Sequence, residues 1–266
     1  MFKYLEVPKY KVEEFLCQSK NYCVCIPVIN EGQKIIKQLK RMATAKINNY
    51  VDIIICDGGS TDNSLSIDFL KSNHVSVLLT KQDIGGLSAQ LRMGYYYALI
   101  YRGYDGVVTI DGNNKDSVEN IIDIVIKLTQ GYDLIQGSRF IAGGQSIHTP
   151  LIRYYAIKLI HIPVVSHISG FKYTDTTNGF RGYSRKFLED PYVEPFRKIF
   201  DSYELLAYLS VRAPQLGYKV IETPVSRSYP SKGRTPTKIN FIKGNFKLLT
   251  ILKNLYQHKY NPNHSV

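Results

Sequence analysis

Two acidic residues close two short apolar runs in the first half of this 266-residue chain. Asp57 ends the run Val51-Asp-Ile-Ile-Ile-Cys, and Asp111 ends the run Gly106-Val-Val-Thr-Ile. A short apolar run closed by turn residues predicts a buried strand of a parallel sheet. Ligands of such sheets bind outside the carboxyl ends of the strands. We therefore predict a site for a nucleotide, a metal ion or both, with the two carboxylates at one sheet edge.

The residue types around the two acids suggest how the chemistry is divided. Asp57 is predicted to accept hydrogen bonds from a base or ribose, and Asp111 to hold a divalent cation that neutralises a diphosphate. Gly85-Gly86 lets the backbone approach a phosphate or sugar closely. In the simpler alternative, each acid only caps the helix that follows it.

The elements that must position these residues alternate between strands and helices over about 140 residues. This order predicts an α/β fold with a mostly parallel central sheet flanked by helices. We expect strands at 22–27, 51–56, 75–79, 107–110, 133–135 and 219–221, and helices at 12–18, 34–45, 64–72, 87–101, 117–128, 202–216 and 238–257.

The chain divides into three expected parts: an N-terminal extension at 1–20, a catalytic domain at 21–237, and a basic amphipathic helix with a tail at 238–266. Two interpretations of the last helix stay open. It could lie on an anionic membrane surface, or it could pack on the domain with its lysines in water.

The net charge of +12 is high for a chain of this length and favours anionic partners. The four cysteines have neither zinc-ligand spacing nor a disulfide-like arrangement, and buried apolar positions explain Cys23 and Cys25 better. We find no signal peptide and no apolar run of roughly 18 residues that could span a membrane. These features predict a cytoplasmic chain.

Six motifs occur in the order seen in one known family. Each motif is weak alone, but their order is specific. They are Pro27-Val-Ile-Asn30-Glu31, Cys56-Asp57-Gly-Gly-Ser60-Thr-Asp62, Gly86-Leu-Ser-Ala-Gln90-Leu-Arg92, Asp111-Gly112-Asn113, Gly137-Ser-Arg139-Phe and Asn178-Gly-Phe-Arg181. Through these motifs the chain resembles the family 2 glycosyltransferases, nearest the dolichyl-phosphate mannose synthase-like branch, over residues 22–237.

The resemblance implies a GT-A fold and an inverting transfer from a UDP- or GDP-sugar, with Mg²⁺ or Mn²⁺, in cell-surface glycan synthesis. It implies metal ligation by Asp111 and Asn113. It also implies donor binding by Pro27, Asn30, Glu31, Asp57, Lys81, Gly86, Gln90, Asp111 and Gly112.

The acceptor implied by the resemblance is a polyprenyl phosphate, or another lipid-linked or glycan acceptor, at the inner face of a membrane. Without a membrane span, the chain would attach peripherally, use a membrane partner protein, form a homo-oligomer or act on a soluble acceptor.

A phosphate acceptor is already an anion, so it needs cations more than a general base. We favour Arg139 and Arg181 because each lies inside a motif. The full set of candidate cations is Arg139, Arg153, Arg181, Arg227, Lys232 and Arg234. For a hydroxyl acceptor, Asp201 or Glu204 would be the base, although acids at a helix start also have an ordinary role with the helix dipole.

Three departures from the family pattern bear on the metal. Gly58 stands where the family has a second acid, and Asn113 replaces the second acid of its Asp-x-Asp element. Lys115 stands where close relatives can place another metal ligand. A cation at that position would repel a divalent ion, and could itself meet the diphosphate.

Three other functions compete with this interpretation. A nucleotidyltransferase would carry a basic, Gly-rich loop after the first strand, where this chain has Asn30-Glu31-Gly32. A nucleic-acid-binding protein would interleave basic and aromatic residues on one element, whereas the 21 tyrosines are spread along the chain. The third, a scaffold without catalysis, is suggested by Gly58 and Asn113.

Overall fold

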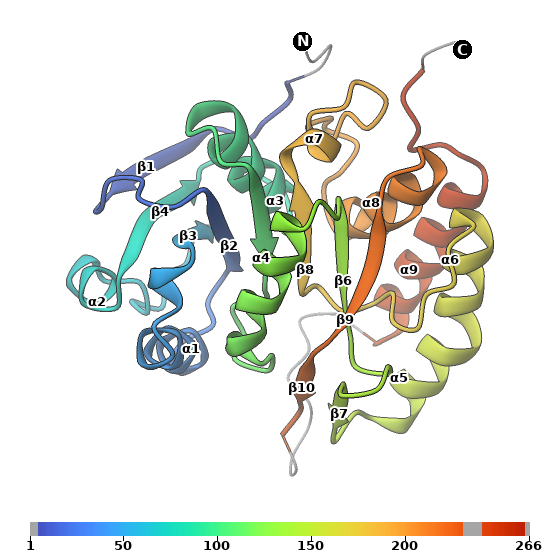
Figure 1. Cartoon of the computed structure of the whole chain (residues 1–266), viewed down its shortest axis with the longest axis horizontal. Coiled ribbons are helices and arrows are strands. Elements are labelled where there is room, and N and C mark those ends of the chain that lie inside the picture. The colour runs from blue at the N-terminus through green and yellow to red at the C-terminus, as the bar shows by residue number, and fades with distance from the viewer. Residues whose placement is uncertain (1–4, 231–240, 264–266) are drawn as a thin grey trace.

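The computed structural model describes residues 5–230 and 241–263, and its core is an eight-stranded sheet in the order β1-β4-β3-β2-β5-β8-β6-β9 (Figure 1). The strands are β1 (Tyr10–Glu14), β2 (Tyr22–Val28), β3 (Asp52–Asp57), β4 (Val75–Lys81), β5 (Gly106–Thr109), β6 (Leu134–Ser138), β8 (Arg181–Ser184) and β9 (Val220–Pro224). A small parallel pair, β7 (Gln145–Ile147) and β10 (Ser226–Ser228), lies beside the sheet.

The sheet is mostly parallel, as predicted. Only β1 and β8 run antiparallel to their neighbours in the described sheet. The register of β2 and β3 pairs Val28 with Asp57, so both strands end at the same edge.

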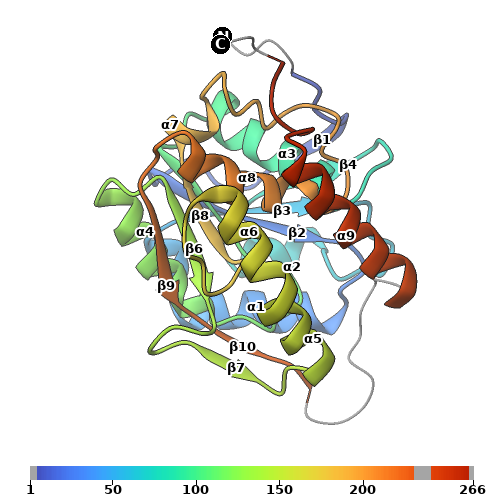
Figure 2. The same cartoon turned by 90° about the vertical axis from the view of Figure 1, so that its right-hand side faces the viewer.

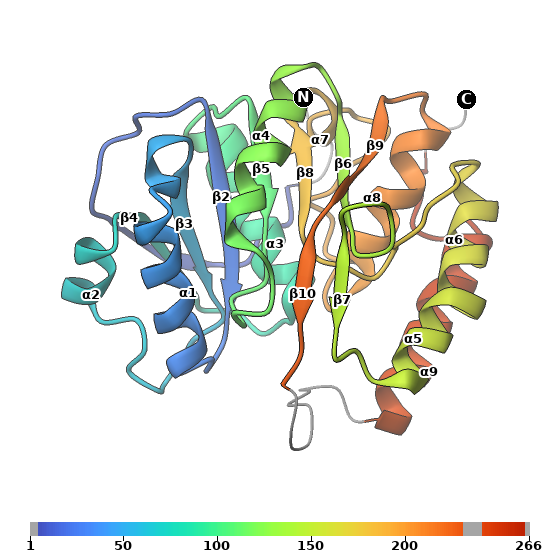
Figure 3. The ribbon, with the colours of Figure 1, turned by 60° about the horizontal axis from the view of Figure 1, so that its bottom comes forward.

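Helices cover both faces of the sheet (Figures 1 and 3). One face packs against α1 (Gln33–Thr44), α2 (Ile67–Ser72) and α4 (Ile121–Thr129), which follows the short 3₁₀ turn Val118–Asn120. The other packs against α3 (Leu87–Tyr96), which continues as a π-helical turn (Tyr97–Tyr101), and against α8 (Glu204–Gln215). The short α7 (Arg185–Leu188) follows β8.

Two further helices contact α8. A long helix is built from α5 (Leu151–Ala156), a π-helical turn (Ile157–His161) and α6 (Ile162–Ser169). Both α6 and α9 (Phe241–Tyr256) contact α8 (Figure 2). Ile251, Leu252 and Leu255 of α9 are buried in the core. The described end of α9 therefore packs on the domain, which is the second of the two interpretations.

The N-terminal segment differs from expectation. The short helix predicted at 12–18 is wrong, because residues 10–14 form the edge strand β1, in which Val12 pairs with Leu79 of β4. The backbone carbonyl and amide groups along the free side of β4 need partners, and this pairing supplies them. Residues 231–240, with the candidate cations Lys232 and Arg234 and the predicted start of the last helix, lie outside the described residues.

Candidate active site

The loops after β2 and β3 are tied together by Asp57. This carboxylate is 4% exposed and accepts hydrogen bonds from the Ser60 backbone N–H (2.9 Å) and hydroxyl (2.6 Å). The Ser60 hydroxyl in turn accepts from the backbone N–H of Asn30 (3.0 Å), and the Thr61 N–H donates to Asn30 Oδ1 (2.8 Å). Asp57 thus closes a turn and shapes the loop of Asn30. Its contact with a base or ribose stays a prediction.

Gln90, predicted as a donor-binding residue, clamps the ends of two strands instead. Its amide nitrogen donates to the carbonyl oxygens of Val28 (2.6 Å) and Cys56 (2.9 Å). Both amide hydrogens are therefore used within the protein, and the side chain is 5% exposed. A Cβ on Gly58 would lie 2.8 Å from this nitrogen, so the clamp explains why Gly58 stands where the family has an acid.

The start of α3 packs closely against the segment before α8. The carbonyl oxygen of Asp201 accepts from the backbone N–H groups of Gly86 (3.0 Å) and Ala89 (3.2 Å). A Cβ on Gly86 would lie 3.3 Å from that oxygen, so close approach requires glycine here. Lys81, at the end of β4, is buried and donates to the carbonyl of Asp83, which holds the loop before Gly86.

The two candidate bases have different surroundings. Glu204 is buried and accepts from the backbone N–H of Ser202 (2.5 Å), so it closes the start of its own helix. The ordinary role of a helix-start acid accounts for it. Asp201 is exposed, and a Cβ on Gly85 would lie 2.8 Å from its Oδ1. Asp201 is therefore the candidate base that the structure leaves accessible.

Asp111 follows β5 and is enclosed by backbone that must be glycine. A Cβ on Gly179 would lie 2.8 Å from Asp111 Oδ1, and one on Gly112 would lie 2.8 Å from Val28 Cγ2. The Asp111 side chain is 25% exposed. The Asn178-Gly179 segment and the end of β2 thus hold this carboxylate at the sheet edge, accessible to a ligand.

The donor atoms around Asp111 fit a hard divalent cation. The amide nitrogen of Asn113 donates to Asp111 Oδ2 (3.3 Å), while Asn113 Oδ1 is buried without a hydrogen-bond partner among the described residues. An unpaired buried oxygen beside a carboxylate is a suitable metal ligand. Within the described residues, no group of three or more His, Cys, Asp or Glu side chains could hold a metal. This matches Mg²⁺ sites, in which one or two protein oxygens act together with substrate phosphates and water.

Arg227 bridges Asp111 and Asp116. Its guanidinium lies 3.0 Å from Asp111 Oδ2 and 2.5 Å from Asp116 Oδ2. Burial raises the pKa of Asp116, and the charge of Arg227 opposes that rise. The strand β10 brings Arg227 here, because Ser228 N–H donates to the Lys115 carbonyl (2.8 Å).

Three cations surround the ring of Tyr229. Lys115 Nζ lies 5.0 Å from the ring centroid, and the guanidinium carbons of Arg153 and Arg227 lie 5.7 and 5.8 Å away. Arg153 also donates to the Tyr229 hydroxyl (3.1 Å). Burial raises the pKa of Tyr229, but Arg227, Arg153 and Arg139 together lower it below its ordinary value. We name Lys115, Arg153 and Arg227 the cationic cluster; its charge suits an anionic ligand.

The motifs favoured Arg139 and Arg181 as acceptor-binding cations, but neither of them belongs to the cationic cluster. Arg181 is 2% exposed and donates to the carbonyl oxygens of Asn178 (2.8 Å) and Thr176 (3.0 Å), so its guanidinium is part of the core. These contacts give Arg181 a structural role, and its contact with an acceptor stays a prediction. Arg139 is 3% exposed and forms a two-bond ion pair with Asp175 (2.6 and 2.9 Å).

The Arg139–Asp175 pair holds the segment that leads to Asn178. Burial alone would raise the pKa of Asp175, but the hydrogen bonds and charge of Arg139 lower it below its ordinary value. Asp175 was not singled out from the sequence, because a single acid in a polar loop has no signal of its own.

Two polar residues of α1 also position the site without having been predicted. Gln38 Oε1 accepts from the backbone N–H of Asn114 (2.7 Å), and Arg41 donates to Asn114 Oδ1 (3.0 Å). Asn114 has a positive φ of 56°, so these contacts hold a strained turn after Asp111. Gln38 is 1% exposed on the apolar face of α1. In the sequence, a glutamine among the apolar positions of the helix expected at 34–45 was the signal that could have identified Gln38.

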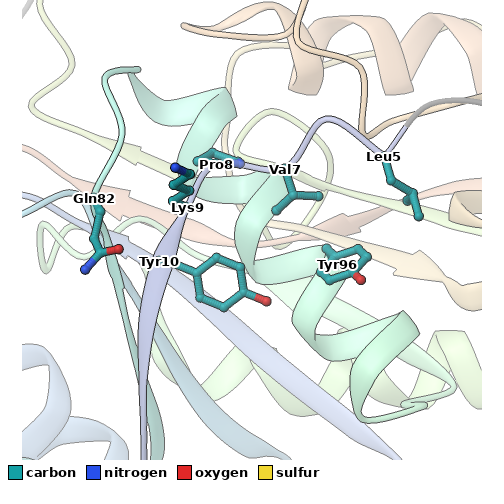
Figure 4. Close-up of a pocket in the computed structure, with 7 residues that line it drawn as sticks. All are labelled: Leu5, Val7, Pro8, Lys9, Tyr10, Gln82 and Tyr96. Carbon is teal, nitrogen blue, oxygen red and sulfur yellow. The ribbon is translucent and has the colours of Figure 1, made fainter.

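A shallow pocket of about 420 Å³ lies along the β1 edge (Figure 4). It is lined by Leu5, Val7, Pro8, Lys9, Tyr10, Gln82 and Tyr96. None of these residues belongs to the predicted site, so the pocket is separate from Asp111.

Comparison with known proteins decides the class. The chain is 26% identical over 206 residues to the polyprenol monophosphomannose synthase of Mycolicibacterium smegmatis, covering 76% of each chain. The relative is a glycosyltransferase by name, and this chain is a glycosyltransferase with a fold of the GT-A type. No family model matches the chain. The sequence comparison confirms the resemblance to the dolichyl-phosphate mannose synthase-like branch.

Solved structures confirm the fold. Glucosyl-3-phosphoglycerate synthase from Mycobacterium tuberculosis with UDP has a TM-score of 0.63 at 14% identity, and covers 89% of this chain and 80% of its own. The same synthase with Mn²⁺ and UDP-glucose has a TM-score of 0.60 at 16% identity, with 90% and 78% covered. This neighbour holds a nucleotide sugar together with a divalent metal.

Proposed function

We propose that this glycosyltransferase moves a sugar from a UDP- or GDP-sugar to an acceptor that carries a phosphate, with inversion at the anomeric carbon. The observation that supports this most is the cationic cluster beside Asp111. A phosphate oxygen is already a nucleophile, so the acceptor needs positive charge to position it. The M. smegmatis relative is named for a polyprenol monophosphomannose product, which supports a lipid-linked acceptor in cell-surface glycan synthesis.

In this proposal each group of residues has a separate role. Asp111 and Asn113 hold Mg²⁺ or Mn²⁺, which neutralises the diphosphate leaving group. Arg153 and Lys115 position the acceptor phosphate on the side of the sugar opposite the diphosphate. If the acceptor presents a hydroxyl, Asp201 is the base. The donor is held by the loops that carry Pro27, Asn30, Glu31, Asp57, Lys81, Gly86 and Gly112.

We further propose that the protein attaches peripherally to a membrane through α5 and the turn after it. No helix in the described part of the chain has both the length and the apolar character to span a bilayer. Leu151, Ile152 and Leu159 are 73%, 69% and 70% exposed, an unusual apolar face for a helix in water. Arg153, on the same helix, belongs to the cationic cluster. A lipid tail and its phosphate would then meet adjacent parts of one helix.

The test of the proposed function combines ligand binding with one substitution. UDP, GDP, CDP and dTDP are each added with Mn²⁺ or with EDTA, and the melting temperature is measured. A ligand that binds only the folded state raises it. We expect one nucleotide to stabilise the protein only with Mn²⁺. Asp111→Ala should abolish that stabilisation and lower sugar transfer about a hundredfold or more. Unchanged transfer by Asp111→Ala would contradict the proposal.

A further inference from the structure

The cation that Asp111 contacts in this structure comes from the protein itself. Arg227 Nη2 lies 3.0 Å from Asp111 Oδ2, the oxygen that also accepts from Asn113. The Arg227 side chain is 9% exposed, and that of Asp116 is fully buried. A buried carboxylate that loses its cation is strongly destabilising, so Asp116 keeps the guanidinium close to Asp111.

This arrangement opposes a bare metal ion. A divalent cation on Asp111 would lie within a few ångströms of the Arg227 guanidinium, and Lys115 adds a second positive charge nearby. Lys115 and Arg227 lie against the same Tyr229 ring, with Lys115 Nζ 5.0 Å and the Arg227 guanidinium carbon 5.8 Å from its centroid. At such distances in a partly buried site, like charges repel appreciably. A diphosphate would supply the negative charge that removes this repulsion.

We propose that Arg227 is the resident counter-cation of Asp111 and makes metal binding depend on the diphosphate. Without nucleotide, the guanidinium competes with the metal for Asp111 Oδ2. With nucleotide, a diphosphate oxygen takes over the Nη2 hydrogen bond while Nη1 stays on Asp116. Metal and diphosphate then strengthen each other's binding, and this coupling is reciprocal. The inference rests on the metal site of the proposed function and adds the residue that controls access to it.

The test measures Mn²⁺ binding directly, from the free-ion electron paramagnetic resonance signal, without any substrate turnover. Arg227→Gln alone would leave Asp116 buried and unpaired, so the comparison is made in an Asp116→Asn background. There, Asp116→Asn and Asp116→Asn/Arg227→Gln differ only at Arg227. The matched control is Asp116→Asn/Arg185→Gln, which removes a cation that pairs with Glu189 (2.8 Å) rather than with a carboxylate of the site. Near-ultraviolet circular dichroism checks that each variant is folded.

Without nucleotide, we expect Asp116→Asn/Arg227→Gln to bind Mn²⁺ about tenfold more tightly than Asp116→Asn, because one nearby positive charge is gone. The Arg185 control should change the affinity little. Adding UDP or GDP should tighten Mn²⁺ binding strongly in the wild type and less in the Arg227 variant.

Equal or weaker Mn²⁺ binding by the Arg227 variant, with wild-type binding still promoted by a nucleotide, would overturn this inference and leave the proposed function standing. Absence of Mn²⁺ binding in all variants, with or without either nucleotide, would overturn both.

Discussion

At the scale of single residues, several motif positions of this chain hold the scaffold rather than a ligand. Gln90 joins the ends of β2 and β3, Arg181 is buried among carbonyl oxygens, and Arg139 pairs with Asp175. Arg227 of β10 contacts Asp111, and Arg153 of α5 lies against the same Tyr229 ring as Arg227. In the proposed function, the family motifs thus build the site, and the charges of neighbouring elements select an anionic ligand.

Gly58 is a residue whose identity follows from its neighbour. We expect Gly58→Ala to lower the free energy of unfolding by about 1–3 kcal/mol, because the added Cβ overlaps the Gln90 amide. In a Gln90→Ala background the same change should cost clearly less, since the clashing atom is gone. Urea unfolding of the four variants measures both. An equal cost in the two backgrounds would show that Gln90 is not the cause.

At the scale of elements, two helices compete for a role at a membrane, and their burial differs. The described end of α9 puts Ile251, Leu252 and Leu255 into the core. By contrast, the exposed side of α5 carries large apolar residues with no partner among the described residues to bury them. Burial against α8 already accounts for the amphipathic pattern of α9, but nothing comparable accounts for α5.

This difference predicts which helix binds lipid. Leu151→Ser/Leu159→Ser should weaken binding to vesicles of phosphatidylglycerol and phosphatidylcholine by about tenfold, since each exposed leucine loses its transfer free energy. The melting temperature should change little, because both side chains are exposed. Leu249→Ser on α9, where Leu249 is 50% exposed, is the matched control. Vesicle co-sedimentation is the measurement. A larger loss of vesicle binding in the control would show that α9, and not α5, makes the membrane contact.

At the scale of the whole molecule, segments distant in sequence complete the fold. The first strand covers the edge of β4, and the last helix packs on α8. The three parts expected at 1–20, 21–237 and 238–266 are thus joined by the sheet and the core wherever they are described. Buried ionisable groups bind the same parts together, and they make stability depend on pH.

His161 contributes to that dependence. Burial, together with the charge of Arg181, lowers its pKa from 6.5 to about 4. Between pH 6.5 and pH 4 this histidine binds a proton in the unfolded chain but not in the folded chain. Free energy of unfolding that is present above pH 6.5 is therefore lost as the pH falls toward 4. We expect a loss of about 1–2 kcal/mol by pH 4.5, discounted for partial exposure.

His161→Gln removes the titrating group and can keep a hydrogen bond to Thr176, which lies 2.7 Å from His161 Nδ1. Urea unfolding at pH 7.5 and pH 4.5 should therefore show a smaller difference for the variant than for the wild type. The same difference in both proteins would assign the pH dependence to other groups.

The sequence by itself determined the parallel strands of the sheet, the edge at which Asp57 and Asp111 lie, and the class of enzyme. These depend on local patterns: apolar runs closed by turn residues, helical periodicity, and motifs in order. Only the tertiary structure decided which cations reach Asp111. Arg227 is separated from Asp111 by 116 positions, and it reaches the site because β10 pairs beside Lys115. Such contacts depend on how distant segments pack, and local periodicity carries no record of that packing.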